Sequence, residues 1–139
     1  ETLGLTVELS VAGDSSLFIA DRNEGNYDFF LGGWYSDYND PLDFLYTNYT
    51  DAYGMSFGGY SNTDYDALAD QLVGETDMDK RLDIYKQMEQ ILLLDDCAFA
   101  PIYYATKQVL LQNWVKDYRT SSFGASAEFI WTYIDGKNQ

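Results

Sequence analysis

The sequence of 139 residues contains no histidine and only one cysteine, Cys97. Without histidine, the chain can build neither a Ser-His-Asp or Cys-His catalytic group nor the usual zinc sites. A single cysteine cannot form a disulfide within the chain, so cysteine usage does not identify the cellular compartment. Because Cys97 stands at the start of an apolar run, we expect it to be a small buried side chain.

Basic residues are also few. Eight Lys and Arg stand against 23 Asp and Glu, which gives a formal net charge of −15. Such a surface repels nucleic-acid phosphates and anionic membranes, so we expect no nucleic-acid partner. No run approaches the roughly 18 apolar residues of a membrane-spanning helix, and we expect no direct membrane insertion by this chain. The sequence begins with neither a Met nor a signal peptide, so we interpret it as a piece of a longer protein.

The remaining composition suits one folded domain. Apolar residues make up 46% of the chain and charged residues 22%. A domain of this length buries roughly two thirds of the surface of its unfolded chain. Aromatic residues reach 17%, with 13 Tyr and 3 Trp, and these residues suit ligand clefts and interfaces as well as cores.

The periodicity of apolar residues predicts strands and helices in turn. We expect strands at residues 5–11, 27–34, 99–104 and 108–112, with a final apolar segment at 129–134. We expect helices from Asp14 or Ser15 to about Asn23, from Asp40-Pro41 to about Thr47, and after each of the capping boxes Ser61-x-x-Asp64 and Thr76-x-x-Asp79. This order predicts a mixed α/β lobe.

The last two predicted helices carry apolar stripes that we expect to form the core. The stripes comprise Tyr65, Leu68, Leu72 and Val73 in the first helix, and Leu82, Tyr85, Met88 and Leu92, widened by Ile84 and Ile91, in the second.

The densest group of functional residues is the segment 32–41, Gly-Gly-Trp-Tyr-Ser-Asp-Tyr-Asn-Asp-Pro. A strand that ends in two glycines leads into a loop with aromatic residues and two carboxylates, and ligands of α/β proteins commonly bind at such strand ends. A carboxylate there, shielded by Trp34 and Tyr38, could hold a ligand ammonium group. The preceding backbone could pair with an extended peptide. The competing interpretation is that Asp40 caps a helix and Asp37 bonds its own loop.

Other acidic groups suggest weaker alternatives. Asp37-x-Asn39 begins like a calcium-binding loop, but Pro41 and Leu42 stand where a third ligand and a glycine belong, so we expect no metal. Paired acids with Tyr and Trp platforms leave open a carbohydrate-active domain, which predicts either a mostly β fold or two carboxyl groups at catalytic separation across an open groove. A structural or adhesive fragment is a third alternative.

The segment 33–41 resembles the Gly-Trp-x-x-Asp-Tyr-x-x-Pro signature of the oligopeptide- and dipeptide-binding proteins of ABC importers. Further segments that resemble this family follow its order, at residues 24–28, 59–68, 81–92, 101–104 and 115–118. The resemblance spans nearly the whole chain, and the order and spacing of the segments make it specific.

The resemblance implies a periplasmic-binding-protein-like fold of type II, with residues 1–139 as a single C-terminal lobe fragment in which helices flank a mixed sheet. It implies extracytoplasmic oligopeptide binding for uptake by an ABC transporter, with permease subunits as partners of the full-length protein and a lipid anchor on that protein. Neither catalysis nor a cofactor is expected. A relative that binds another solute, such as a dipeptide, a sugar or a metal chelate, is the alternative within the family.

The resemblance also assigns the site. Asp37 matches the aspartate that binds the peptide α-ammonium, and the backbone of Gly33, Trp34 and Tyr35 matches the segment that pairs with the peptide. Family members are several times longer, with a first lobe and part of the second that this chain lacks. A lone lobe offers half a cleft, so we expect it to bind peptides weakly.

Overall fold

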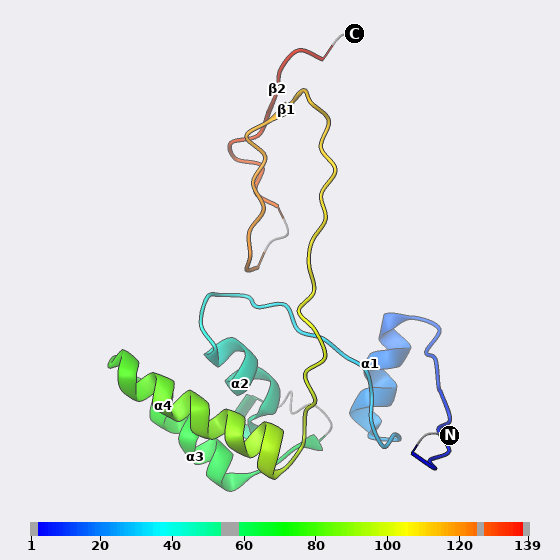
Figure 1. Cartoon of the computed structure of the whole chain (residues 1–139), viewed down its shortest axis with the longest axis vertical. Helices are drawn as coiled ribbons and strands as arrows, with labels where there is room; N and C mark the ends of the chain where they lie inside the picture. The colour runs from blue at the N-terminus through cyan, green and yellow to red at the C-terminus, as the bar shows by residue number, and fades with distance from the viewer. Residues whose placement is uncertain (1–2, 54–58, 125–126, 138–139) are drawn as a thin grey trace.

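The computed structural model describes residues 3–53, 59–124 and 127–137. The helices, in chain order, are α1 (Ser15–Glu24), α2 (Leu42–Tyr49), the 3₁₀ turn Asp51–Tyr53, α3 (Thr63–Leu72), α4 (Met78–Glu89) and the π-helical segment Gln90–Asp95, and the strands are β1 (Val115–Lys116) and β2 (Tyr133–Ile134). Helices α2, α3 and α4 gather at one end of the molecule, and the β1–β2 pair stands at the other, with a long extended run between them (Figure 1). Within the described residues, no helix combines the length and the apolar character needed to cross a membrane.

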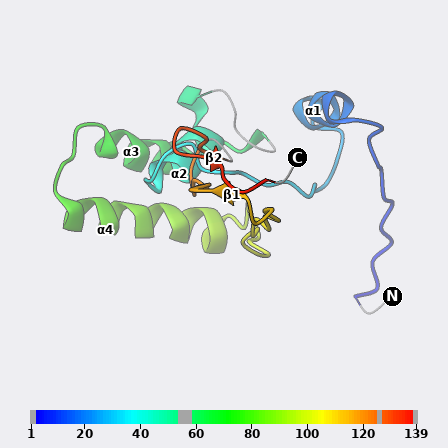
Figure 2. The ribbon, with the colours of Figure 1, turned by 90° about the horizontal axis from the view of Figure 1, so that it is seen from above.

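The core lies where α2, α3 and α4 pack together, and α1 stands apart from it (Figure 2). Its buried apolar residues are Leu45, Tyr49, Tyr65, Ala69, Leu72, Ile84, Tyr85, Met88 and Leu92. The two predicted stripes therefore supply most of the core. Val73 and Leu82 are exceptions, at 69% and 47% exposed. Val73 follows the last residue of α3 and has extended backbone. Leu82 lies on a different side of α4 from the buried residues Ile84 and Met88.

Helix α1 begins and ends as predicted. The Asp14 carboxylate accepts hydrogen bonds from the amides of Ser16 and Leu17, and Gly25 ends the helix with a φ of 71°, a conformation that glycine adopts without steric cost. No residue of α1 is buried.

The predicted caps of α3 and α4 are each wrong by one residue. Asn62 caps α3 and accepts hydrogen bonds from the amides of Asp64 and Tyr65. Asp77 caps α4 in the same way. Ser61 instead donates its hydroxyl to Asp51 Oδ2 at 2.7 Å. At the start of each helix, the side-chain oxygen of Asn62 or Asp77 serves as the cap in place of the neighbouring Ser61 or Thr76. As N-cap residues, Asn and Asp are preferred to Thr and about equal to Ser.

The predicted strands at 5–11, 27–34, 99–104 and 108–112 have no paired partner within the described residues, so as strands they are wrong for this chain. The described sheet has two antiparallel strands, in which Val115 pairs with Ile134 and Lys116 with Tyr133. Alternating apolar residues specify which face a strand would bury, but a strand also needs a neighbour to bond with. The mixed helix and strand composition agrees with an α/β class, while residues 3–53, 59–124 and 127–137 do not form the larger predicted sheet.

Cys97 is exposed rather than buried, contrary to the prediction. It follows the π-helical segment with a left-handed φ of 50°, where the chain leaves the helical core for the extended run that begins near Phe99. Its thiol lies 3.5 Å from the carbonyl oxygen of Leu94.

Leu82 in α4 and Leu92 in the π-helical segment that follows it provide a test of this core. Leu92 is 1% exposed and Leu82 is 47% exposed. Leu92→Ala should lower the free energy of unfolding by about 2–5 kcal/mol, because it removes buried apolar volume and leaves a cavity. Leu82→Ala should cost less than about 1 kcal/mol. Urea unfolding followed by circular dichroism measures both, and equal losses for the two variants would contradict the described packing.

Candidate functional site

The loop between the extended run 27–34 and α2 is held by a buried carboxylate. Asp43, in the first turn of α2, is 1% exposed. Its Oδ2 accepts a hydrogen bond from Trp34 Nε1 at 2.9 Å and another from the backbone amide of Asp37 at 2.9 Å. A single oxygen atom therefore fixes both ends of the segment 34–37.

Asp40 attaches the end of the same loop to α4. Its carboxylate pairs with Arg81 Nη2 at 2.8 Å, and it accepts further hydrogen bonds from the Tyr85 hydroxyl and from the Leu42 amide. Arg81 also donates to the carbonyl oxygens of Leu72 and Glu75, so it joins the end of α3 to the start of α2. The predicted helix entry at Asp40-Pro41 is displaced by one residue, since Pro41 stands at the cap position and Leu42 is the first residue of α2, while the Asp40 carboxylate accepts a hydrogen bond from the Leu42 amide.

These contacts shift the pKa of both partners. Burial alone raises the pKa of Asp40, but the hydrogen bonds from Tyr85 and from the Leu42 amide, together with the Arg81 charge, outweigh it and leave the pKa lowered. Burial, followed by the hydrogen bond to the Asp40 carboxylate, raises the pKa of the Tyr85 hydroxyl. Asp40 is therefore held as a carboxylate and Tyr85 as a neutral donor.

Two distant segments also reach the loop. The amide of Gly124 donates to the Ser36 carbonyl at 2.8 Å. Lys107 Nζ lies 5.9 Å from the centroid of the Tyr35 ring, within the range of a cation–π contact. The run that leads into α2 thus passes beside the long extended run of residues 99–112 (Figure 1).

The predicted site residues lie together on this loop, and most of them face solvent. Gly33, Tyr35 and Asp37 are exposed, and Trp34 is half-buried through its bond to Asp43. The Asp37 carboxylate makes no hydrogen bond or ion pair to any other described residue. The competing expectation that its side chain bonds its own loop is thus not met within those residues, since Asp37 is held by its backbone amide instead.

Sequence reasoning missed three residues that shape the loop, namely Asp43, Arg81 and Tyr85. Asp43 follows Asp40 by three positions at a helix start, which is the same capping-box spacing as between Ser61 and Asp64. This spacing could have identified Asp43 as a residue of structural interest. The partnership of Arg81 with Asp40 crosses 41 positions of sequence and leaves no local pattern.

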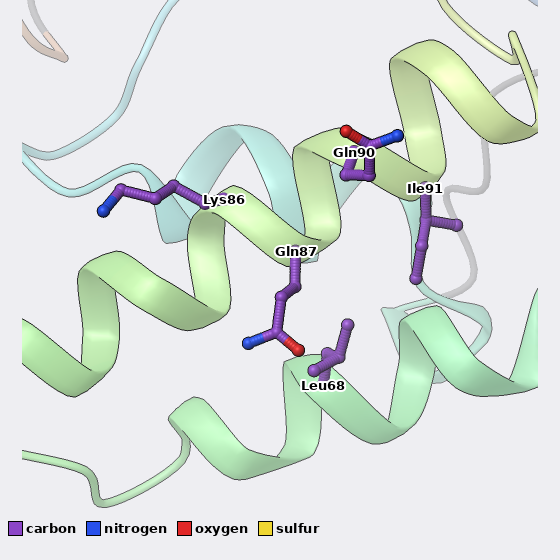
Figure 3. Close-up of a pocket in the computed structure, with 5 residues that line it drawn as sticks. All are labelled: Leu68, Lys86, Gln87, Gln90 and Ile91. Carbon is purple, nitrogen blue, oxygen red and sulfur yellow. The ribbon is translucent and has the colours of Figure 1, made fainter.

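A shallow hollow elsewhere contains none of the predicted residues. It lies between α3 and α4 and is lined by Leu68, Lys86, Gln87, Gln90 and Ile91. Gln87 points across the hollow toward Leu68, whereas Lys86 points away from it (Figure 3). Across residues 3–53, 59–124 and 127–137, no three His, Cys, Asp or Glu side chains gather where they could share a metal ion.

Comparison with known proteins relates this geometry to a family. No family model matches the chain. The periplasmic oligopeptide-binding protein OppA of Escherichia coli is 30% identical over 118 residues, which are 85% of this chain and 21% of OppA. The periplasmic murein peptide-binding protein MppA of Escherichia coli is 32% identical over 85% of this chain and 21% of its own length. OppA of Bacillus subtilis is 32% identical over 84% of this chain and 20% of its own length.

This chain matches one segment of the oligopeptide- and dipeptide-binding proteins of ABC transporters. The predicted resemblance to that family is confirmed. The chain spans about a fifth of the length of the curated relatives it matches.

Solved structures of the family share the backbone path. The pheromone receptor PrgZ, in a structure that describes its mode of peptide binding, matches with a TM-score of 0.73 and 29% identity over 95% of this chain and 24% of its own. The substrate-binding domain of an oligopeptide ABC transporter from Bacillus anthracis matches with a TM-score of 0.73 and 25% identity over 84% of this chain and 23% of its own. A match over 95% of the chain includes extended runs as well as helices.

The Asp40 contacts predict how stability depends on pH. Because the pKa of Asp40 is lowered in the folded protein, its contribution is complete above the carboxyl pKa of the unfolded chain, about 4, and is lost as the pH falls through the folded value. Asp40→Asn should lower the free energy of unfolding by about 2 kcal/mol at pH 7. The difference from wild type should shrink below about pH 4.

Urea unfolding at a series of pH values measures this difference. Asp83→Asn is the matched control, since Asp83 pairs with Lys86 where both side chains are more than 70% exposed. It should change stability by less than about 0.5 kcal/mol. If Asp40→Asn matches wild type at pH 7, the ion pair does not hold the loop to α4.

Proposed function

We propose that the chain is the C-terminal lobe fragment of a two-lobed extracytoplasmic protein that captures oligopeptides and delivers them to the permease of an ABC importer. The names of the relatives support this proposal, since they include periplasmic and oligopeptide-binding proteins and a di/tripeptide-binding protein of Pseudomonas aeruginosa. In this proposal the full-length protein carries a lipid anchor, needs no cofactor and catalyses no reaction.

The observation that carries the proposal is the environment of Asp37. Its carboxylate is exposed and has no cationic partner within the described residues, while its backbone is fixed by the bond to Asp43. A carboxylate held in place but not neutralised suits a charge-assisted hydrogen bond to the α-ammonium group of a peptide. Asp37 would thereby select ligands with a free amino terminus.

The backbone before Asp37 supports the second half of the proposal. Gly33 and Tyr35 lie in extended chain and make no backbone hydrogen bond to another described residue. Together with Trp34 they present an edge to which an extended peptide can add by main-chain pairing. Ligand side chains would then be enclosed by parts of the protein outside this chain.

The unpaired apolar segments support the assignment to a larger lobe. Leu5, Leu9 and Val11 are 66%, 83% and 79% exposed, and Leu110 is fully exposed. Large apolar side chains on unpaired extended backbone favour association with other strands. In the full-length protein these runs would pair with the remainder of the polypeptide and complete the sheet that the sequence predicts.

One relative keeps the alternative within the family open. A protein named heme-binding protein A, from Haemophilus influenzae, is 28% identical over 82% of this chain and 21% of its own length. The solute bound by the full-length protein to which residues 1–139 belong could therefore differ from an oligopeptide. A carbohydrate-active domain of mostly β fold is not favoured, because the described sheet has two short strands.

Asp37→Asn in the full-length protein tests the role of the carboxylate. The variant should weaken binding of peptides with a free amino terminus by roughly tenfold to hundredfold, because it removes a charge-assisted hydrogen bond. The same peptides with N-acetylated termini should bind wild type and variant almost equally. Isothermal titration calorimetry measures both series.

Asp83→Asn serves as the control, since Asp83 lies on the exposed face of α4 and its replacement removes the same charge. It should leave both series unchanged. Equal losses for free and acetylated peptides in Asp37→Asn would argue against an α-ammonium site at Asp37.

The lobe proposal predicts a difference between this chain and its parent protein. Residues 1–139 alone should bind peptides weakly or undetectably, because half a cleft offers few contacts to offset the loss of ligand freedom. Calorimetry on both forms with one peptide checks this expectation. Micromolar binding by the 139-residue chain would refute it.

A further inference from the structure

Asp43 is a buried acid that the proposed binding reaction does not use directly. Its side chain is 1% exposed, and it has no Lys or Arg partner among the described residues, since Arg81 pairs with Asp40. Burying a carboxylate without a cation costs free energy unless hydrogen bonds offset it. Here the offset comes from two N–H donors, at Trp34 and Asp37, and from the position of Asp43 in the first turn of α2.

Both donors belong to the candidate binding loop. Trp34 stands at one end of the segment 34–37 and Asp37 at the other, and both bonds meet at Asp43 Oδ2 with a length of 2.9 Å. The bond to Asp37 involves its own amide, so it constrains the backbone from which the ligand-facing carboxylate extends. Two other described bonds to this segment, from the Gly124 amide to the Ser36 carbonyl and from the Ser36 hydroxyl to the Tyr38 carbonyl, do not involve Asp37 itself.

We propose that Asp43 is the positioning residue of the site, and that it sets the loop geometry in which the Asp37 carboxylate faces an incoming ammonium group. This inference rests on the proposed function of Asp37. Asp43 touches no ligand in this arrangement; it acts through Asp37 and Trp34. Its role differs from that of Asp40, whose partners Arg81 and Tyr85 lie on the helical core.

The oxygen of Asp43, rather than its charge, carries this role. An asparagine side chain keeps a carbonyl oxygen with two lone pairs, which can accept both hydrogen bonds. Alanine removes the acceptor. Asp43→Asn should therefore preserve the site, and Asp43→Ala should disrupt it.

The test measures binding of free and N-acetylated peptides to the full-length protein by calorimetry. Asp43→Ala should weaken free-terminus peptides by roughly tenfold or more and acetylated peptides by no more than about threefold, while Asp43→Asn should stay within about threefold of wild type for both. In the Asp37→Asn background, Asp43→Ala should add little further loss, because the group it positions is already gone. The indole N–H resonance of Trp34, assigned by comparison with Trp34→Phe, should move in Asp43→Ala and remain near its wild-type position in Asp43→Asn.

Three outcomes would overturn the inference: equal loss of both peptide series in Asp43→Ala, full additivity with Asp37→Asn, or an Asp43→Asn variant as impaired as Asp43→Ala. If Asp43→Ala is unfolded by circular dichroism, Asp43→Leu, which has a similar volume and no acceptor atom, replaces it under the same criteria. Failure of Asp37→Asn to discriminate free from acetylated peptides would instead remove the proposed function. The Trp34 resonance would still report whether Asp43 orders the loop.

Discussion

The ion pair between Asp40 and Arg81 is the contact on which the arrangement of the site depends. It joins the end of the binding loop to α4 and, through the carbonyl oxygens of Leu72 and Glu75, to the end of α3. The Tyr85 hydroxyl adds a second bond from α4 to Asp40, and the two bonds to Asp43 attach the start of the loop to α2. The ordered part of the site is therefore an extension of the three-helix core rather than a separate unit.

Three aspartates within seven positions illustrate how partners decide the role of a side chain. Asp37 is exposed and has no described partner for its carboxylate, Asp40 is paired with a cation, and Asp43 is buried against N–H donors. The residue type is the same in each case. Its availability to a ligand depends on what the fold has already placed beside it, so two of the three acids organise the loop and leave the third accessible.

Much of the helical structure could be predicted because it depends on local rules. Helical spacing identified Tyr65, Leu72, Met88 and Leu92 as core, and the helix ends were correct to within one or two residues. The strands could not be predicted in the same way. A period of two indicates the face that a strand would bury, but pairing depends on a neighbour that no local window contains.

The local features of the site could be predicted from the sequence, whereas its contacts between distant positions could not. The signature around Trp34 and Asp37 is contiguous, so it could be found in the sequence, and the start of α2 near Asp40-Pro41 could be predicted from the proline to within one residue. The Arg81 and Tyr85 contacts join positions 41 and 45 residues apart, and only the folded chain brings them together. The convergence of one Asp43 oxygen on two N–H groups is likewise a property of three-dimensional geometry rather than of composition.

The isolation of α1 has a consequence for how the molecule opens. A helix of ten residues that buries no side chain depends on its caps, on its intrinsic helix propensity and on side-chain contacts such as that of Phe18 with Phe30, and helices of that length are marginal in water. Its amides should therefore exchange with solvent deuterium through local fraying, at free energies well below that of the core. The amides around Met88 and Leu92 should exchange only when α2, α3 and α4 separate, so one polypeptide contains two levels of cooperativity.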